Sequence, residues 1–346
     1  MIENVHESTL RKSLGVVADA IEALCCVEIR PAGSMQGVVR PLAVMAREKQ
    51  GGIPMLIAAE KLIQRVGAGD VVVIATGFYV PEVMPNGESD GPLGAASLAY
   101  ALSNGIGAVP LILCEEQCLE PTRATLNAIG LKERPLEVAL HTKSSFVIQI
   151  FPADLNAERR AKEIIQELKP TAVIVIEKPG LNAKGVAHRG GGKAITEGRM
   201  RIEVLTGKAR ETNILTIAIG DNGNEAGMGL VAEACREYKQ YGAICQCPCQ
   251  GGIAAVDECE VTIVASVSNW GGYGIAALLG VLLGNENTLQ DPDTERRLLE
   301  DCLRAGAVDG VYFAPRFFVD GIPSLIHCHV VEILKIIMNM SLGQKG

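Results

Sequence analysis

Six apolar runs of strand length recur along the chain, and they restrict its fold more than any other feature. The runs lie at 71–75, 109–113, 146–150, 172–176, 214–219 and 261–265. They are rich in Val and Ile and lack regular polar alternation, which is typical of parallel strands buried on both faces of a sheet. Helical patterns separate many of them. The sequence therefore predicts a three-layer α/β fold with a mostly parallel central sheet flanked by helices.

The predicted helices lie at 10–24, 53–66, 94–103, 157–168, 230–241, 273–283, 293–305 and 324–340. We find no Pro/Ser-rich linker, so we expect a single α/β domain over 1–346, with a helical region at 1–50 packed on it. The least regular segment runs from 180 to 206. Its glycine-rich stretch at 190–193 fails the spacing of a P-loop, and we interpret it as either a substrate loop or a plain surface loop.

The composition excludes several classes of partner. Hydrophobic residues make up 48 % of the chain and charged residues 21 %, which indicates a globular protein. The formal net charge is −8 and there is no block of Lys or Arg, so we expect no nucleic-acid partner. No apolar run approaches the roughly 18 residues of a membrane span, and the polar stretch at 1–11 lacks the apolar core of a signal peptide. We therefore expect a cytoplasmic protein with no membrane partner, and the sequence is compatible with a homo-oligomer.

Eleven cysteines are present, and three of them form a dense group, Cys245, Cys247 and Cys249. Their C-x-C-x-C spacing differs from the C-x-x-C pairs of zinc sites, and the five histidines add no familiar zinc spacing. We interpret the group as free thiols in a loop, with adventitious metal binding or oxidation as the alternatives.

Acidic residues follow several predicted strands, at the edge where open α/β sheets bind their ligands. They are Glu88 and Asp90 after 71–75, Glu177 after 172–176, Asp221 and Glu225 after 214–219, and Asp309 and Asp320 near the C-terminus. Carboxylates that converge repel one another unless a cation neutralises them. Sites made of oxygen ligands select Mg²⁺, Mn²⁺ or Ca²⁺. Glu115 and Glu116 also follow a strand, but we expect them to be solvated.

The glycine-dense turn at 220–229 joins a strand to a helix and carries both Asp221 and Glu225. A simpler interpretation is that Asp221 caps the helix and that Glu225 is favoured by the helix dipole. The free amides of such a turn also suit an anion, so Gly223 and Asn224 are candidate substrate-binding residues.

A second candidate substrate contact lies at Ser268, Asn269 and Trp270, which follow the strand at 261–265. The Asn-Trp pair would shape a small pocket, with Asn269 orienting the substrate. The alternative is a well-packed turn.

Four motifs together resemble the D-glutamate cyclase family, in its C-terminal-domain type. They are ESDGP at 88–92, IEKPG at 176–180, GDNGNEAGMG at 220–229 and VSNWG at 267–271. The resemblance covers about 71–333 and identifies the chain as a single-domain homologue, although Asn222 replaces the Gly that the family usually has after its Asp. It implies an enzyme with an acid-lined metal site that cyclises D-glutamate to 5-oxo-D-proline with loss of water.

Residues and resemblance combine into one leading hypothesis, a Mn²⁺- or Mg²⁺-dependent lyase that acts on a small anionic metabolite. The metal ligands would be Glu88, Asp90, Glu177, Asp221, Glu225 and Asp320. The catalytic candidates are Asp221, Glu225 and Asn269, and the substrate-binding candidates are Gly223, Asn224, Ser268, Asn269 and Trp270. A Mn²⁺- or Mg²⁺-dependent phosphatase of a small phosphorylated metabolite is the first alternative, because carboxylate clusters with two cations also activate water against phosphate. A non-catalytic module that binds a metal or metabolite is the second.

Overall fold

The computed structural model describes the chain at 2–30, 36–195 and 198–343. The strands within these residues are β1 (Val71–Ala75), β2 (Val109–Cys114), β3 (Lys132–Glu133), β4 (Ser145–Ile150), β5 (Ala172–Ile176), β6 (Leu215–Gly220), β7 (Val261–Val264), β8 (Phe318–Val319) and β9 (Ile322–Pro323). All six predicted apolar runs are strands, and their bounds agree with the prediction to within one residue.

The helices are α1 (Ile2–Cys25), α2 (Val39–Gln50), α3 (Pro54–Arg65), α4 (Pro92–Ala101), α5 (Leu119–Ala128), α6 (Leu136–Ala139), α7 (Asn156–Glu163), α8 (Ile202–Glu211), α9 (Ala232–Tyr238), α10 (Ser268–Leu283), α11 (Pro292–Arg304) and α12 (Ser324–Gly343). Short π-helical turns, η1 (Leu102–Ile106) and η3 (Ile164–Leu168), extend α4 and α7, and 3₁₀ turns occur at η2 (Glu116–Cys118), η4 (Gly229–Val231) and η5 (Glu286–Thr288).

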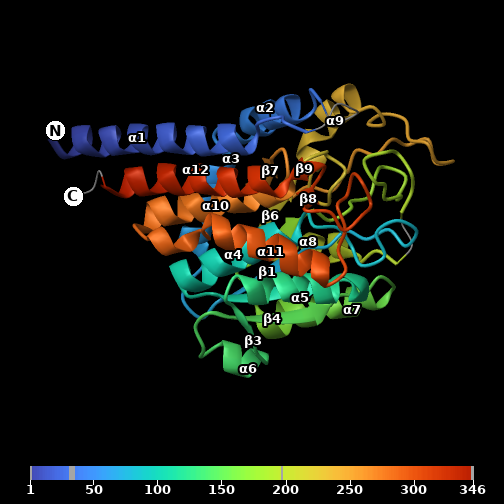
Figure 1. Cartoon of the computed structure of the whole chain (residues 1–346), viewed down its shortest axis with the longest axis horizontal. Helices are drawn as coiled ribbons and strands as arrows, with labels where there is room; N and C mark the ends of the chain where they lie inside the picture. The colour runs from blue at the N-terminus through green and yellow to red at the C-terminus, as the bar shows by residue number, and fades with distance from the viewer. Residues whose placement is uncertain (1, 31–35, 196–197, 344–346) are drawn as a thin grey trace.

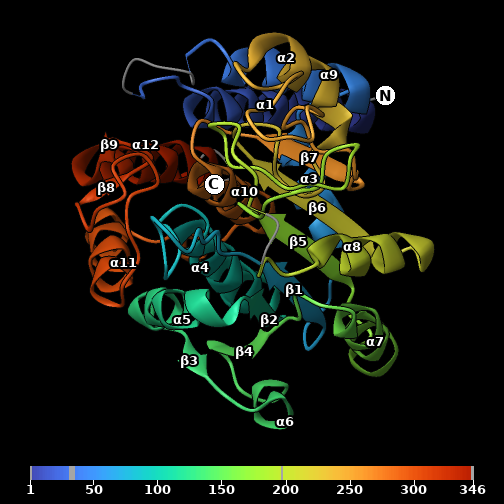
Figure 2. The same cartoon turned by 90° about the vertical axis from the view of Figure 1, so that its right-hand side faces the viewer.

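Seven strands form one sheet in the order β3-β4-β2-β1-β5-β6-β7. Every neighbouring pair in it is parallel, and β8 and β9 form a separate antiparallel pair. Helices α3, α4, α5 and α10 pack on one face, with α11 and α12 outside them, while α7 and α8 lie on the other face (Figures 1 and 2). The predicted three-layer α/β fold with a parallel sheet is therefore confirmed.

The two faces of the sheet bury different sets of aliphatic side chains. In β1, Val72 and Ile74 belong to the larger core beneath α4 and α10, whereas Val73 and Ala75 belong to the core beneath α7 and α8. This alternation follows from the strand period of two. Because both faces are covered, the strands read as continuous apolar runs in the sequence.

Helix α10 starts at Ser268, five residues before the predicted helix at 273–283. Each glycine lowers helix stability by about 1 kcal/mol relative to Ala. The glycines in the first turns of α10 are therefore the reason why the sequence did not predict a helix there. Packing explains them. A Cβ on Gly272 would lie 2.8 Å from the carbonyl oxygen of Gly94 in α4. The close approach of α4 and α10 brings the start of α10 against the loop that follows β1.

Some elements had no prediction. Helix α8 begins inside the segment that we described as irregular, and α5 and the two exposed residues of β3 were missed, whereas α2 lies within the helical region expected at 1–50. The predicted helix at 230–241 is only α9, which spans Ala232–Tyr238 and follows a 3₁₀ turn.

The N-terminal helix α1 packs on α10, α12 and α3, and Ile21 and Cys25 enter the larger core. In the described part of the chain, α12 is the one helix that is long and apolar enough to cross a bilayer. Its buried face, which includes Val331 and Leu334, packs into that same core. Length and composition do not separate a core helix of this kind from a membrane span.

Candidate active site at the carboxyl edge of the sheet

The structure brings together six acidic residues that the sequence singled out. Glu177 directly follows β5, Asp221 directly follows β6, and Glu88 and Asp90 lie between β1 and α4. These three strands are neighbours in the sheet, so their carboxyl ends meet at one edge. The turn between β8 and β9 adds Asp320. The members of this carboxylate cluster are Glu88, Asp90, Glu177, Asp221, Glu225 and Asp320, and each is at most 7 % exposed.

Two trios of carboxylates share one member. Asp90, Asp221 and Asp320 each place one oxygen within 4.8 Å of the others, and so do Glu177, Asp221 and Glu225. Asp221 therefore lies between two sets of oxygen donors. This arrangement is the one expected of ligands around one or two hard cations.

Two of the clustered acids have unusual backbone conformations. Glu177 has φ of +48° and Asp320 has φ of +54°, in the left-handed region that costs a non-glycine residue roughly 1–2 kcal/mol. Such strain collects at functional sites because the surrounding structure imposes it. Gly91 also has positive φ, and a Cβ there would lie 2.7 Å from Oγ1 of Thr76. The loop after β1 therefore needs glycine at this point to carry Glu88 and Asp90 to the site.

Burial and mutual repulsion perturb the pKa values of the cluster. Burial, followed by the charges of the neighbouring acids, raises the pKa of Glu88 and of Glu177 well above the usual range. The same two causes raise the pKa of Glu225 well above that range and the pKa of Asp90 to about 6. Asp90 is the least perturbed of these four because the backbone amides of Ser268 and Asn269 donate to it, at 2.9 and 2.8 Å. Groups with such pKa values are typical of active sites.

Arg30, which sequence reasoning missed, lies within the cluster. Its Nη2 pairs with Oδ2 of Asp221 and lies 2.6 Å from Oδ2 of Asp320. Burial alone would raise the pKa of Asp221, but the Arg30 guanidinium outweighs burial and lowers it. Burial raises the pKa of Asp320 well above its usual range in spite of Arg30. Arg30 follows the end of α1 and belongs to no motif, so only the fold reveals its position.

A cavity of about 280 Å³ borders the cluster. Its lining includes Glu88, Glu177, Asp221 and Asp320, the cations Arg30 and Arg189, and Asn222, Asn224, Phe78 and Phe313. Arg189 stacks over the ring of Phe313 at 5.4 Å. The glycine-rich stretch at 190–193 contributes Gly190 and Gly191 to the wall, which favours the substrate-loop interpretation of that segment. The cavity therefore offers both carboxylates and guanidinium groups to a small molecule.

The start of α10 lies behind the cavity, and it holds the acids in place. Oδ1 of Asn269 accepts hydrogen bonds from the amides of Gly91 and Gly94, at 2.8 and 2.7 Å. The hydroxyl of Ser268 donates to Glu177. Neither side chain lines the cavity. The proposed substrate contacts of Ser268 and Asn269 are therefore replaced by a positioning role.

Trp270 also lies away from the cavity. Its side chain is fully buried in the core, and its Nε1 donates to Nδ1 of His327 at 2.9 Å. Trp270 therefore does not lie where a substrate contact would need it. Its position matches the alternative interpretation, a well-packed turn. The indole is large and apolar, so core packing provides the burial that such a residue needs.

In the turn after β6, backbone amides donate hydrogen bonds to an acid of the same turn. The N–H groups of Asn222 and Gly223 donate to the carboxylate of Glu225, at 3.0 and 2.8 Å. Gly223 therefore does not offer its amide to a substrate anion. Asn224 does line the cavity, and its buried Oδ1 has no hydrogen-bond partner. Positive φ falls on Gly223, at +82°, rather than on Asn222, so the departure from the family pattern at 222 costs the turn nothing.

Three further acids have other surroundings. Glu115, which we expected to be solvated, is buried and paired with the fully buried Lys178, so that expectation was wrong. Lys178 follows Glu177, and its ammonium group lies near the ends of β1 and β2, where it contacts the carbonyl of Gly77 and the carboxylate of Glu115. No sequence pattern indicated this pairing. Glu116 is exposed as expected. Asp309 is buried but its carboxylate accepts backbone amides, including that of Gly321 in the turn between β8 and β9 at 2.7 Å, and Asp320 rather than Asp309 belongs to the carboxylate trios.

The donors of the cluster suit divalent cations. Arg30 and Lys239 lie against the cluster and offset two of its six carboxylate charges. A net negative charge remains when all six acids are ionised, even with Arg189 in the cavity wall, and a divalent cation would offset it. The carboxyls must otherwise stay protonated, as their raised pKa values indicate. Oxygen donors of this kind match Mg²⁺ or Mn²⁺.

The fold and the site define an open-sheet α/β protein with a carboxylate-lined ligand cavity at the carboxyl ends of its strands. Comparison with known proteins agrees. A family model for the C-terminal region of D-glutamate cyclase-like proteins matches residues 43–335, so the chain belongs to that family. A human protein named mitochondrial D-glutamate cyclase is 26 % identical over 238 residues, which are 67 % of this chain and 36 % of the relative. The chain thus spans little more than a third of that enzyme's length, and the relation is distant.

Proposed function

We propose that the protein is a divalent-cation-dependent lyase that converts D-glutamate to 5-oxo-D-proline and water. One observation carries the proposal: four of the six buried carboxylates of the cluster line a cavity that Arg30 and Arg189 also line. Glutamate has two carboxylates and an ammonium group, so such a cavity offers a partner for each of its charges. The family relation supports the same substrate class.

The reaction moves two protons from nitrogen to oxygen. The substrate ammonium must lose one before its nitrogen attacks the γ-carboxyl carbon and the second once that bond has formed, and the departing γ-oxygen must gain both to leave as water. Glu88 and Glu177 line the cavity and have raised pKa values, which suits them to accept the protons from nitrogen and pass them to the departing oxygen. Arg30 and Arg189 would hold the substrate carboxylates. A bound Mn²⁺ or Mg²⁺ would polarise the carbonyl under attack.

A metal-dependent phosphatase is the second candidate, and the sharing of Asp221 by two carboxylate trios favours it. Two-metal sites activate water and stabilise the leaving oxygen of a phosphate ester. The two arginines would then bind the phosphate group. Both functions would use the same cavity to bind a small anionic metabolite.

A direct assay separates the candidates. Purified protein is incubated with Mn²⁺ or Mg²⁺ and with D-glutamate, L-glutamate or a panel of phosphate esters. We expect 5-oxo-D-proline from D-glutamate, no phosphate release and loss of turnover after chelation. Phosphate release without cyclic product would replace the lyase by the phosphatase. Tight metal binding without turnover of any substrate would leave a non-catalytic module.

The active-site assignment has its own control. Glu88→Gln keeps the size of a cavity-lining acid but removes its proton transfer, so turnover should fall by about 100-fold or more. Asp257→Asn is the matched variant, because Asp257 is a partly buried acid that accepts the Gly227 amide at 2.8 Å outside the cluster. We expect Asp257→Asn to keep its turnover.

A further inference from the structure

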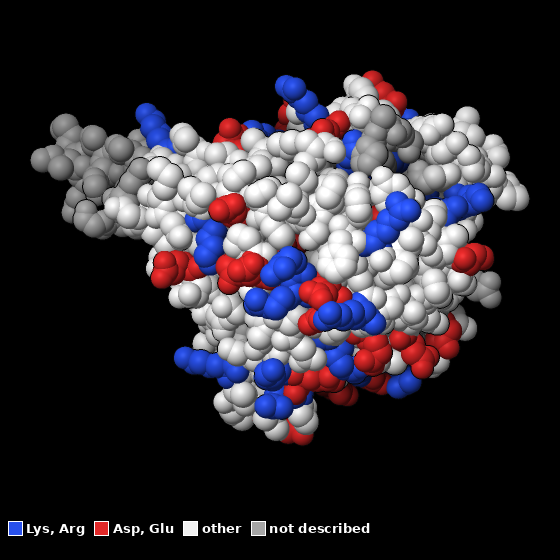
Figure 3. All heavy atoms as spheres, viewed as in Figure 1, with Lys and Arg blue, Asp and Glu red and all other residues white. Residues whose placement is uncertain are grey.

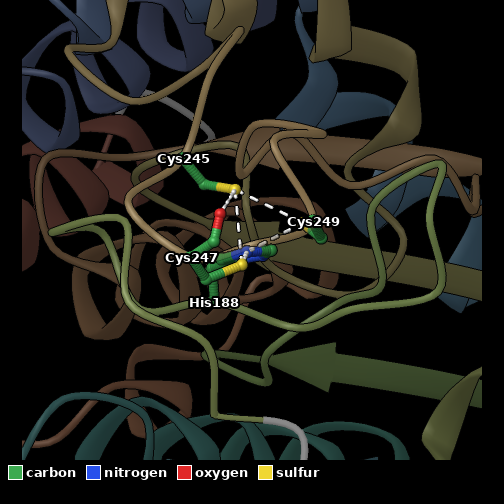
Figure 4. Close-up of side chains that lie close together, drawn as sticks. All are labelled: His188, Cys245, Cys247 and Cys249. Atoms are coloured by element: carbon green, nitrogen blue, oxygen red, sulfur yellow. Dashed lines mark hydrogen bonds between the residues drawn. The ribbon is translucent and has the colours of Figure 1, made fainter.

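A second group of metal-binding side chains lies beside the cavity. His188 comes from the loop that follows β5, whereas Cys245, Cys247 and Cys249 come from the loop that follows α9. In Figure 4 the four side chains point toward one another from these two loops. The sequence analysis treated the cysteines as free thiols, because His188 is 57 positions away from the first of them.

Four of the six distances between donor atoms are close to the edges of a zinc tetrahedron, and the other two are within 4.8 Å. Sγ of Cys245 lies 3.5 Å from Sγ of Cys247 and 3.3 Å from Sγ of Cys249. Nε2 of His188 lies 3.3 Å from Sγ of Cys247 and 3.6 Å from Sγ of Cys249. Bond lengths of about 2.3 Å to sulfur and 2.0–2.1 Å to nitrogen put the edges of a zinc tetrahedron at roughly 3.5–3.8 Å. The observed spacings need only a small expansion to match it.

Hydrogen-bond donors from outside the cluster reach one of its sulfur atoms. The amide of Gly251 and Nδ2 of Asn182 both donate to Sγ of Cys249, at 3.4 and 3.5 Å. Asn182 is itself 2 % exposed, and its Oδ1 accepts the amides of Lys184 and Val186 at 2.9 and 3.0 Å. Hydrogen bonds to ligating sulfur are the outer-shell contacts expected around a metal centre.

We propose that His188, Cys245, Cys247 and Cys249 form a structural zinc site. The three thiols lose their protons as the ion binds, and His188 gives the lone pair of Nε2. Four protein donors close the coordination sphere, and closed spheres are structural rather than catalytic. The donors all lie within 4.8 Å of one another, which leaves room for one ion and not for a cluster of several metals.

The zinc site would shape the active-site cavity. The chain runs from His188 directly into Arg189, Gly190 and Gly191, which form part of the cavity wall. The carbonyl of His188 accepts a hydrogen bond from Nδ2 of Asn224 at 2.9 Å, and Asn224 belongs to the turn that carries Asp221. A zinc ion that joins the two loops would hold this wall against the carboxylate cluster.

The zinc content of the full chain tests the proposal. The protein is produced in zinc-supplemented medium, purified under reducing conditions without a metal-affinity step, and analysed for bound metals by mass spectrometry. We expect one zinc per chain. Cys247→Ser and His188→Asn should each reduce zinc by at least about tenfold, because either change opens a closed set of four ligands. Cys328→Ser, in α12 and outside the cluster, is the matched control and should retain full zinc.

A measurement on the wild-type chain tests the zinc site even if the variants fail to fold. Cobalt(II) in place of zinc should give the intense charge-transfer and ligand-field bands of a tetrahedral thiolate site. Zinc-free wild-type protein without these bands would overturn the proposal. So would iron as the stoichiometric metal, a disulfide between two of the three cysteines in the reduced preparation, or unchanged zinc in the folded His188→Asn variant.

Discussion

The carboxylate cluster and the Cys/His cluster lie on either side of one loop, yet they arise in different ways. In the carboxylate cluster, Glu177 and Asp221 directly follow the neighbouring strands β5 and β6, and the other acids come from turns at the same edge of the sheet. The Cys/His cluster joins two irregular loops and no strand supplies a ligand. The first has hard oxygen donors and borders a cavity, whereas the second has mainly soft sulfur donors and is closed.

The difference shows what each cluster needs from a metal. The sheet assembles the carboxylates regardless of any ion, at the cost of strong repulsion that a cation relieves. The two loops of the Cys/His cluster are joined by a few hydrogen bonds, such as that from the Gln246 amide to the Gly192 carbonyl at 2.9 Å, and a metal ion would add four bonds to them. We therefore expect metal at the first cluster to govern chemistry and metal at the second to govern local order.

The largest effect should come from Asp221→Asn, since Asp221 belongs to both carboxylate trios. We expect Mn²⁺ affinity to fall by more than the roughly 10–100-fold that outer-shell changes cost. Zinc content should stay the same. Calorimetric titration with Mn²⁺ measures the first quantity and mass spectrometry the second. Unchanged Mn²⁺ affinity would remove Asp221 from the metal site, and lost zinc would show that the two clusters are one unit.

Glu295 provides a reference for a buried acid with neutral partners. Burial raises its pKa to about 7, although Tyr273 and Gln290 donate hydrogen bonds to it. The folded state holds this proton more tightly than the unfolded state, so stability falls as pH rises from about 4.5 to about 7. Glu295→Gln removes that loss, which amounts to about 2–3 kcal/mol by pH 8.

Urea unfolding of both proteins at pH 5 and pH 8 measures this difference. The variant should be the more stable protein at pH 8, and the gap should close at pH 5. An equal gap at both values would show that Glu295 does not titrate in this range. Added Mn²⁺ should leave the gap unchanged, because Glu295 lies outside the carboxylate cluster.

A smaller effect is expected for Trp270→Phe. The variant loses the hydrogen bond to buried His327, which should lower the free energy of unfolding by about 1–3 kcal/mol. Thermal melts measure the loss. Mn²⁺ affinity and zinc content should stay within about twofold of wild type, because the indole N–H of Trp270 donates to His327 and not to a proposed metal ligand. A twofold change in affinity corresponds to only about 0.4 kcal/mol. A specific fall in metal affinity would return Trp270 to the site.

The smallest effect is local. Cys247→Ser should raise amide hydrogen exchange by about tenfold in the two loops, 186–195 and 245–253, because local openings become less costly. Strands β5 and β6 should exchange as before. Uniformly faster exchange across the sheet would show that the cluster supports the whole domain rather than one cavity wall.

Sequence reasoning recovered the fold and most of the carboxylate cluster for one physical reason. Parallel strands that are buried on both faces are visible in the sequence as continuous apolar runs. The acids that follow β1, β5 and β6 lie at the same edge of the sheet because parallel strands have their carboxyl ends at one edge. It could not place Arg30, whose position depends on the path of the chain after α1. It also missed the partnership of His188 with Cys245, Cys247 and Cys249, because the two loops meet only in three dimensions. Asn269 and Trp270 were misjudged because glycines disguised the start of α10.

The assignment of a cytoplasmic location and of the oligomeric state stays a prediction from the sequence. The human relative is named as a mitochondrial protein. On the face drawn in Figure 3, acidic and basic side chains are interspersed over the described residues, and the expectation that nucleic acid is not a partner stays a prediction.

Anomalous diffraction from crystals soaked in Mn²⁺ tests the central claim most directly, with data recorded on either side of the manganese and zinc absorption edges. The account predicts a manganese peak against Asp221, between the acids of one or both trios, and a zinc peak among His188, Cys245, Cys247 and Cys249. Arg30 should withdraw from Asp221 as the manganese ion binds. A cluster without manganese, with Arg30 still paired to Asp221 and Asp320, would contradict the account.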